Sequence, residues 1–314
     1  FCVYSNTQAH KREKMIKRIF AHTLTAGIFC FNCNVSAGNV DLLPAKAVDD
    51  WFVSLSNWGR WGKDDQKGTL NLITPETRVA AARLVTKGIS VSLAHNALTN
   101  IAMDNPHPYV HEMNGGMDSI SVMFHSLVHS HIDALCHAPY QGKMYNNISA
   151  KSMTEQGCNK LSVTNLGDGI FGRGVLMDIA RLKGVSWLPP GTPVYAEDLE
   201  AWEKKSGIKV RSGDILLVRT GNWALRSSKG PWNSASKGFA DLKRKTAGLH
   251  ASAVAWLHKK DVAVYGTDGS GDVHPTGVEG MGSPVHQLLL SALGTPMFDN
   301  LDLEGLAKIA EDQK

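Results

Sequence analysis

The sequence predicts a mixed α/β fold, because short apolar runs typical of strands alternate with segments of helical spacing. Residues 213–221 and 262–268 are nearly continuous apolar runs, which are typical of buried central strands. Residues 172–179 form a third strand-like run, and residues 196–205 follow it with helical spacing. Strands that alternate with helices in this way indicate a sheet covered by helices.

Two further helices and one long loop complete the outline. Residues 251–260 have helical apolar spacing, and residues 284–294 begin with Pro284 and end at Gly294, as a capped helix would. Residues 104–116 are rich in Gly, Pro and Asn and carry His107 and His111. We expect a long loop there, and loops of that length are often lids.

Length and charge favour one catalytic domain that binds a small molecule. The 314 residues, 43% of them hydrophobic, can bury one large core, and we place this domain at 38–314. The formal charge of +4 arises entirely within residues 11–18, and the rest of the chain has 28 basic and 28 acidic residues. A neutral body without a basic stripe argues against nucleic acid as a partner.

Residues 1–37 are predicted to be a presequence. Residues 15–37 have a basic start, an apolar middle and small residues at Val35-Ser36-Ala37, which is the pattern of a signal peptide. We expect cleavage after Ala37, a periplasmic or secreted protein, and no membrane association afterwards, because the apolar part is too short and too interrupted to span a bilayer. The alternative is an ordinary N-terminal helix of a cytoplasmic protein.

Cys136 and Cys158 are the two cysteines that follow the presequence. Export would permit a disulfide between them. Because Cys136 lies within a cluster of histidines, we expect it to be a free, buried thiol that packs beside that cluster.

A dense histidine cluster predicts a metal site. His125, His129, His131 and His137 fall within thirteen residues, together with Asp133. If residues 121–132 form a strand, positions 125, 129, 131 and 133 share one face. Imidazoles and a carboxylate at this spacing suit Zn²⁺ or Mn²⁺, whose charge compensates for the burial of Asp133. His137 follows where the chain turns, and it could transfer protons beside the ion.

The run of His131, Asp133 and His137 resembles the His-x-x-x-His-x-Asp-x-x-x-His signature of the cyclase family, which includes bacterial kynurenine formamidase and isatin hydrolase. Leu127 stands where the signature has its first histidine, and His129 is the best candidate for the missing ligand. The resemblance continues through residues 57–65, 68–74, 142–146 and 213–221, and it looks like the longer branch of the family.

This resemblance implies a central mixed β-sheet or barrel-like core flanked by helices, and a homodimer. It also implies a second half-site near the C-terminus, in which His286 or Gln287 and Asp299 contribute further ligands. Because Asp299 is shorter than the glutamate of kynurenine formamidases, we favour one ion over two, with a slight preference for Mn²⁺ over Zn²⁺. His250 could orient substrate or water.

Trp58, Trp61 and Tyr145 lie in the matched segments and could line an aromatic substrate pocket, with Gln287 beside them. Core packing is the alternative for these aromatic residues.

The expected activity is hydrolysis of a small amide, cyclic amide or N-formyl group. A bound ion would polarise the substrate carbonyl and lower the pKa of water, and His137 would pass the proton to the leaving nitrogen. Two alternatives remain open: a non-catalytic protein that binds metal or a small ligand, and a lyase or cyclase that acts on a carbonyl compound.

Overall fold

The computed structural model describes residues 42–231 and 244–313. The predicted presequence, residues 1–37, lies outside the described residues, so the signal peptide and its cleavage after Ala37 stay predictions. None of the described helices combines the length and the apolar character that crossing a bilayer requires.

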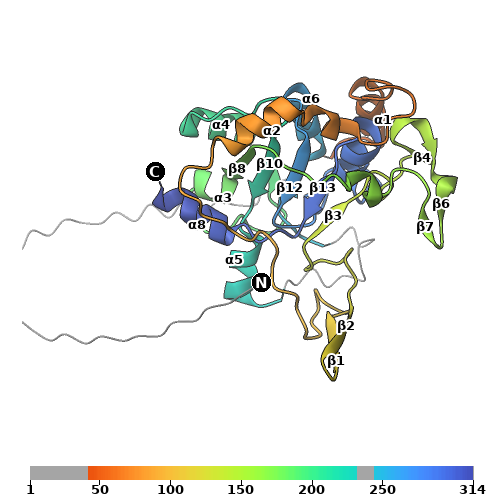
Figure 1. Cartoon of the computed structure of the whole chain (residues 1–314). Coiled ribbons are helices and arrows are strands. Elements are labelled where there is room, and N and C mark those ends of the chain that lie inside the picture. The colour runs from red at the N-terminus through yellow and green to blue at the C-terminus, as the bar shows by residue number, and fades with distance from the viewer. Residues whose placement is uncertain (1–41, 232–243, 314) are drawn as a thin grey trace, which may run out of the picture. The chain divides into compact units, whose positions relative to one another are not determined.

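A five-stranded mixed sheet forms the centre of the structure (Figure 1). Its strands lie in the order β3 (His131–Asp133), β13 (Met297–Asp299), β12 (Val264–Thr267), β10 (Ile215–Arg219) and β8 (Gly174–Asp178). Strands β8, β10, β12 and β13 are parallel, whereas β3 pairs antiparallel with β13. The predicted α/β class with a central mixed sheet is confirmed, and within the described residues this sheet is open, with β3 and β8 at its edges.

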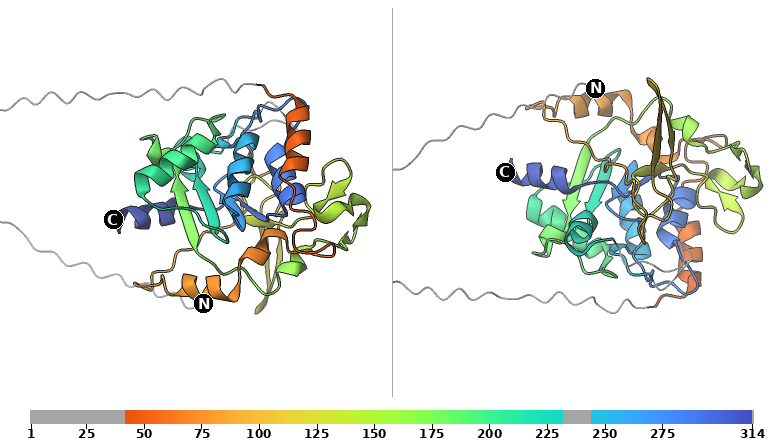
Figure 2. Two further views of the ribbon diagram at one scale, coloured as in Figure 1. Left: turned by 90° about the horizontal axis from the view of Figure 1, so that it is seen from above. Right: turned by 90° about the horizontal axis from the view of Figure 1, so that it is seen from below.

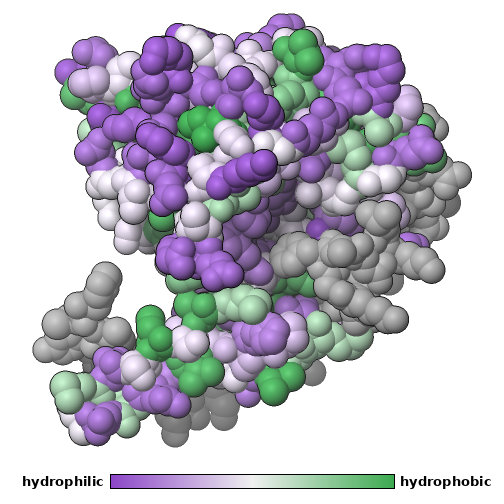
Figure 3. Space-filling view, turned by 90° about the vertical axis from the view of Figure 1, so that its right-hand side faces the viewer, coloured by the Kyte–Doolittle hydropathy of each residue, from purple (hydrophilic) through white to green (hydrophobic). Residues whose placement is uncertain are grey.

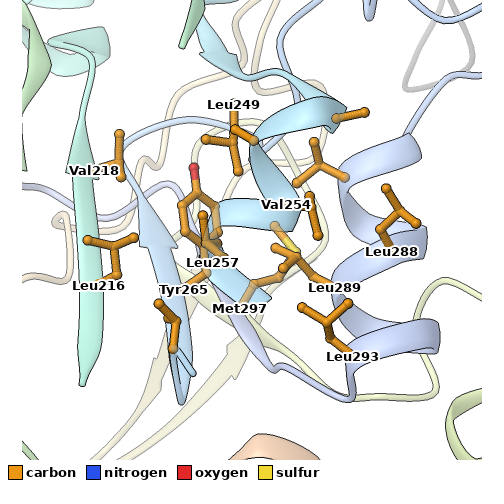
Figure 4. Close-up of a cluster of buried hydrophobic side chains, with 14 of the residues drawn as sticks. Leu216, Val218, Leu249, Val254, Leu257, Tyr265, Leu288, Leu289, Leu293 and Met297 are labelled. Carbon is orange, nitrogen blue, oxygen red and sulfur yellow. The ribbon is translucent and has the colours of Figure 1, made fainter. Parts of the chain in front are cut away.

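The largest hydrophobic core lies on one face of this sheet (Figure 4). Leu216 and Val218 of β10 belong to it, together with Tyr265 of β12 and Met297 of β13. Leu217 belongs to a separate cluster, because successive side chains of a strand point to opposite faces. The continuous apolar run of β10 therefore reflects a strand that is buried on both sides.

Helices cover both faces of the sheet (Figure 2). The main core is covered by α1 (Ala45–Ser54), α4 (Ala196–Ser206), α6 (Val254–Lys259) and the π-helix η6 (Gln287–Leu293). On the other face, Leu306 of α8 (Glu304–Asp312) packs against the cluster of Leu217, Leu301 and Leu303.

The predicted helices are confirmed, with their caps. Residues 284–294 form α7 (Pro284–His286) and η6, and Gly294 follows them with a left-handed φ of 69°. Proline suits the first helical position because it lacks an N–H there, and glycine adopts the left-handed conformation at little cost. Residues 251–260 form η5 (Ala251–Ala253) and α6.

Shorter elements complete the described chain. The other helices are α2 (Pro75–Ala82), α3 (Ile179–Leu182), α5 (Asn222–Lys229), η1 (Gly68–Leu72), η2 (Tyr145–Asn147), η3 (Ala150–Ser152) and η4 (Val163–Leu166). Two-stranded ribbons pair β1 (Val110–Asn114) with β2 (Met117–Ser121), β4 (Lys143–Met144) with β5 (Ile148–Ser149), β6 (Met153–Thr154) with β7 (Gly157–Cys158), and β9 (Pro193–Val194) with β11 (Gly248–Leu249).

Two predictions of local structure are wrong. Within the strand expected at residues 121–132, only the last residue of β2 and the first two residues of β3 are extended in strands, and the chain between them runs through bends. Most of the segment preceding β3 therefore lacks the period-two alternation on which the shared face of His125 and His129 was based. The loop expected at residues 104–116 contains β1 and the turn to β2, so part of it is a hairpin.

The expectation of a free Cys136 thiol is also wrong, because Cys136 and Cys158 form a disulfide. Cys136 lies in the turn after β3, and Cys158 is the last residue of β7. Their Cα atoms are 6.6 Å apart, within the range that a disulfide spans. The bridge ties the β6–β7 hairpin to the chain immediately before His137.

Candidate metal centre

The centre is built around Asp133, whose side chain is fully buried at the edge of the sheet. Four imidazole nitrogens approach its two carboxylate oxygens. His125 Nδ1 and His131 Nε2 lie 3.2 and 3.3 Å from Oδ1, and His286 Nε2 and His137 Nε2 lie 3.4 and 3.8 Å from Oδ2. The structure thus brings together four histidines that are up to 161 residues apart in the chain.

The donor set around Asp133 fits a divalent metal ion. Among the described residues, no donor reaches either oxygen of Asp133 with hydrogen-bond geometry, although both oxygens are buried. Two ligand atoms that each lie about 2.1 Å from a shared Zn²⁺ are separated by roughly 3.0–3.4 Å, which follows from tetrahedral or octahedral angles. The spacings of 3.2–3.4 Å are therefore those expected for ligands around an ion, and imidazole with carboxylate suits Zn²⁺ or Mn²⁺.

Two sets of ligand atoms can be distinguished, and they share Asp133. One set joins Asp133 to His125 and His137, and the other joins it to His131 and Asp299. In each set the ligand atoms lie within 4.8 Å of one another. The second set is the more enclosed of the two, because His131 and Asp299 expose little of their side chains whereas His125 is half exposed.

His131 and Asp299 meet because β3 and β13 are neighbours. The two residues are opposite each other in the antiparallel ladder. His131 donates from Nδ1 to the carbonyl oxygen of His129 over 2.8 Å, which leaves Nε2 directed at Asp133. The tautomer of His131 is thus set by a backbone acceptor.

The ring of His129, which we expected to replace the missing ligand, lies outside both sets. Its Nδ1 is 3.2 Å from both Ser126 Oγ and the carbonyl oxygen of Met123. His125 lies at Asp133 instead, because the bent chain before β3 brings its ring back over the site. The carbonyl group of His129 accepts the hydrogen bond from His131, and the ring that lies at Asp133 is that of His125.

A second carboxylate, that of Asp272, orients the ring of His286. Its Nδ1 lies 2.5 Å from Oδ2 of Asp272, and its Nε2 lies 3.4 Å from both Asp133 and Asp299. Asp272 also accepts hydrogen bonds from the backbone N–H groups of Val285 and His286 at the start of α7. A histidine that donates one ring N–H to a carboxylate presents its other nitrogen as a ligand.

The electrostatics of the centre follow from burial and proximity. Burial opposes ionisation of Asp133, yet interactions with His125, His131 and His286 outweigh burial and lower its pKa. Burial also disfavours the imidazolium form of His286, but Asp299 and Asp133 raise its pKa well above the ordinary value. Without an ion, a protonated His286 balances the acidic groups, and a bound cation would take over that role.

His137 stands at the more exposed side of the centre. About a third of its side chain is exposed, and its ring stacks on that of His125 with centroids 4.1 Å apart. Burial and the neighbouring imidazoles His125, His286 and His131 lower the pKa of His137 to about 4, although Asp133 opposes this effect. His137 is therefore neutral at pH 7 and able to accept a proton.

A cavity of about 590 Å³ opens beside these imidazoles. His125, His131 and His137 line it on the side of the centre. The remainder of its wall is apolar apart from Ser162 and consists of Phe124, Ile132, Ala134, Met153, Val163 and the two bridged cysteines. A volume of this size suits a small organic molecule.

His250 and Gln287 were also predicted site residues, and the structure places them outside both ligand sets. His250 Nδ1 lies 2.8 Å from Ser252 Oγ, and the ring contacts Tyr195 with centroids 4.8 Å apart. Gln287 directly follows His286, and its buried Oε1 has no hydrogen-bond partner among the described residues.

The three aromatic residues predicted to line a pocket pack elsewhere. Trp58 donates to the carbonyl of Ser291 over 2.7 Å, and the buried Tyr145 donates to Asp65 over 3.1 Å. Trp61 lies beneath the guanidinium group of Arg60. None of the three lines the cavity beside the candidate centre, and they belong to the core or its margin.

Sequence reasoning missed Asp272 and Met153, and it considered the Cys136–Cys158 disulfide but favoured a free thiol. Asp272 lies shortly after β12 in a Gly-rich segment, and ligand sites often lie beyond the carboxyl ends of parallel strands, so its position was a usable signal. Met153 has no comparable signal, since only the pairing of β6 with β7 brings it to the cavity.

Fold and site together define a mixed α/β protein with a His/Asp centre suited to a divalent metal. The family model described as "Putative cyclase" matches residues 88–271, and the chain belongs to this cyclase family. A solved structure described as a novel cyclase is 33% identical, with a TM-score of 0.70, and the match covers 84% of this chain and 90% of that one.

Isatin hydrolases also appear among similar structures. One, bound to the product analogue thioisatinate, is 16% identical with a TM-score of 0.48, over 74% of this chain and 88% of that one. Isatin hydrolase A from Ralstonia solanacearum is 19% identical with a TM-score of 0.44, over 73% and 85%. Among curated proteins, none matched the sequence of this chain.

Proposed function

We propose that this chain is a metal-dependent hydrolase of a small amide, cyclic amide or N-formyl substrate. The observation that carries the proposal is Asp133, a fully buried carboxylate whose oxygens accept no hydrogen bond within the described residues and face four imidazoles beside a cavity. Burial of a charged carboxylate without compensating positive charge would destabilise the folded protein. Membership of the cyclase family supports an enzymatic role.

The residues that would hold the ion are Asp133, His131, Asp299 and His286, with His125 at the exposed side. When bound, a divalent ion supplies Lewis acidity and lowers the pKa of water. We propose that one ion binds. Mn²⁺ and Zn²⁺ are both candidates, because mixed imidazole and carboxylate ligation suits both metals.

His137 is the proposed proton carrier. Its neutral ring accepts a proton at Nε2 from the attacking water, while the water oxygen bonds to the substrate carbonyl carbon. The C–N bond then breaks, and the same proton passes from Nε2 to the leaving nitrogen. The products are a carboxylic acid and an amine, or a ring-opened amino acid from a cyclic amide.

The first test is the metal content of the purified chain and of its Asp133→Ala variant, by elemental mass spectrometry. We expect about one equivalent in the parent and almost none in the variant. The same samples would then be assayed against amides, cyclic amides, N-formyl amines and lactones. Tight metal binding without turnover across that panel would replace the hydrolase by a non-catalytic binding protein.

Hydrolysis and a lyase reaction are separated by isotope labelling. Turnover in H₂¹⁸O places one ¹⁸O atom in the carboxylate product of a hydrolase, because the nucleophile is water. A product without ¹⁸O would establish the lyase or cyclase alternative.

We further propose a homodimer that forms through the β1–β2 hairpin. Every residue of both strands is exposed, including Met113, Met117 and Ile120. Figure 1 draws this hairpin at the bottom of the molecule, and Figure 3 shows hydrophobic surface in the lower part of its view. An isolated hairpin is marginally stable in water, so a second copy is the proposed cover. Light scattering should find a dimer in the parent and a monomer in Met117→Glu/Ile120→Glu.

A periplasmic or secreted location is proposed as well. The Cys136–Cys158 disulfide supports it, because disulfides persist in oxidising compartments. Fractionation of the native host with an antibody against the chain tests it, and recovery in the cytoplasm would refute it.

A further inference from the structure

The wall of the cavity beside the candidate centre is unusual in its chemistry. Apart from three imidazoles and Ser162, its lining residues are apolar, and within the described chain none of them is Lys, Arg, Asp or Glu. A charged group bound against the apolar part of this wall would find no oppositely charged side chain there to pair with. The lining therefore favours an uncharged, apolar group next to the scissile bond.

Part of this wall is the β6–β7 hairpin, which is too small to hold its own position. Each strand has two residues, and Met153 pairs directly with Cys158. Ribbons of this size are not independently stable. The disulfide from Cys158 to Cys136 fixes the hairpin to the residue that precedes His137.

The pairing and the disulfide together set the position of Met153. Because Met153 is the register partner of the bridged Cys158, the distance of its side chain from the His137 turn is fixed through one covalent link and one strand pair. Met153 and both cysteines line the cavity, so the sulfur atoms of this wall lie where the non-reacting part of a substrate would bind.

We propose that the disulfide-held β6–β7 hairpin determines specificity, with Met153 as the selecting residue, and that the substrate is an uncharged molecule with an apolar, aromatic-sized group. This inference rests on the proposed function and adds the substrate class to it. The cavity volume of about 590 Å³ accommodates one substituted ring and the scissile group.

The test uses two probes with the same amide bond, acetanilide and 4-acetamidobenzoate, the second of which carries a carboxylate. Binding to the full chain would be measured by calorimetry, and cleavage would be measured separately. We expect acetanilide to bind at least about tenfold more tightly, which corresponds to about 1.4 kcal/mol. Met153→Lys should reverse this preference, because its ammonium group would pair with the carboxylate.

Met103→Lys is the matched control, since Met103 is exposed and does not line the cavity. It should leave the ratio of the two affinities unchanged. In Cys136→Ala/Cys158→Ala, with the hairpin released, the preference for acetanilide should shrink while the metal content stays the same. A smaller preference for acetanilide with an unchanged metal content would show that the cavity wall has changed while the metal centre is intact.

The outcomes separate this inference from the proposed function. Selective binding of acetanilide without cleavage would retain the substrate class and refute the hydrolase. Equal binding of the two probes, binding of neither, or a Met153→Lys variant with an unchanged ratio would overturn the inference, whether or not amides are hydrolysed.

Discussion

His286 donates a hydrogen bond from Nδ1 to Oδ2 of Asp272 over 2.5 Å, and the same carboxylate accepts from the backbone N–H groups of Val285 and His286. These contacts fix Asp272 at the start of α7 and fix the ring of His286 with Nε2 toward Asp133 and Asp299. Asp272 is thus a positioning residue for the candidate centre.

Asp272→Asn should weaken metal binding by about 10–100-fold, which is typical for loss of a carboxylate behind a metal-binding histidine. The amide can no longer accept the Nδ1 proton without turning, so the tautomer of His286 is released. Affinity would be measured by competition with a chromogenic chelator. Asp268→Asn is the control, because Asp268 is an equally buried carboxylate that accepts hydrogen bonds from Thr220 and Gly221 and contacts no histidine among the described residues. Equal affinity losses in both variants would contradict the role of Asp272.

His125 and His129 should differ sharply when each is replaced by glutamine. His125→Gln removes a nitrogen that lies 3.2 Å from Asp133, and we expect metal affinity to fall by at least about tenfold. His129→Gln removes a ring that contacts Ser126 and Met123, and we expect a stability loss of about 1–2 kcal/mol with little change in affinity. Chelator competition and denaturant unfolding measure the two effects. The opposite pattern would restore His129 as the ligand.

Much of the fold was predictable because buried strands and helices have recognisable patterns of apolar residues in the sequence. The runs of β10 and β12 are apolar on both faces, and α7 with η6 is bounded by Pro284 and Gly294. The expected strand over residues 121–132 failed for a tertiary reason. Asn300 donates to the carbonyl groups of Ser126 and His129 and accepts from Ser130, so a residue about 170 positions away holds this segment in its bent form.

The candidate site was predictable in its composition and less so in its geometry. Metal chemistry follows from the density of His and Asp residues around Asp133, and that density is visible in the sequence. Which rings face the carboxylate depends on the bends before β3, and the Cys136–Cys158 disulfide depends on the β6–β7 hairpin. Neither contact has a spacing rule that sequence alone could supply.

His137→Gln should keep the metal and lose turnover. His137 is the most distant of the four imidazoles from Asp133, at 3.8 Å, and its low pKa of about 4 leaves it neutral and able to accept a proton. We expect kcat to fall by about 10²–10⁴-fold, the usual effect of removing a general base, with metal content unchanged. His258→Gln in α6 serves as the control for a histidine outside the cavity. A proportional loss of metal in His137→Gln would instead identify His137 as a ligand.

The raised pKa values of His286 and His131 make metal binding dependent on pH. For both residues burial lowers the pKa, but the nearby carboxylates of Asp133 and Asp299 raise it above 6.5. A ligand imidazole must be neutral, so metal binding at pH 7 should release protons, and affinity should fall as the pH falls. Calorimetry at pH 7 in buffers of different ionisation enthalpy measures this release, which should diminish as the pH rises. Binding heats that are the same in every buffer would contradict it.

The same shifts fix the sign of the stability change in the metal-free chain. A histidine whose pKa is raised by folding contributes stability that is present below its unfolded pKa of about 6.5 and is lost as the pH rises through the folded value. His137, His250, His258 and His274 have the opposite shift, and their contribution to the slope ends only when the unfolded imidazoles have lost their protons, about one pH unit above 6.5. The metal-free chain should therefore lose stability from about pH 7.5 upward, and the metal-bound chain should not, because its ligand histidines are already neutral. Urea unfolding with and without EDTA between about pH 7.5 and 9 measures both slopes, and parallel curves would show that His286 and His131 do not bind the ion.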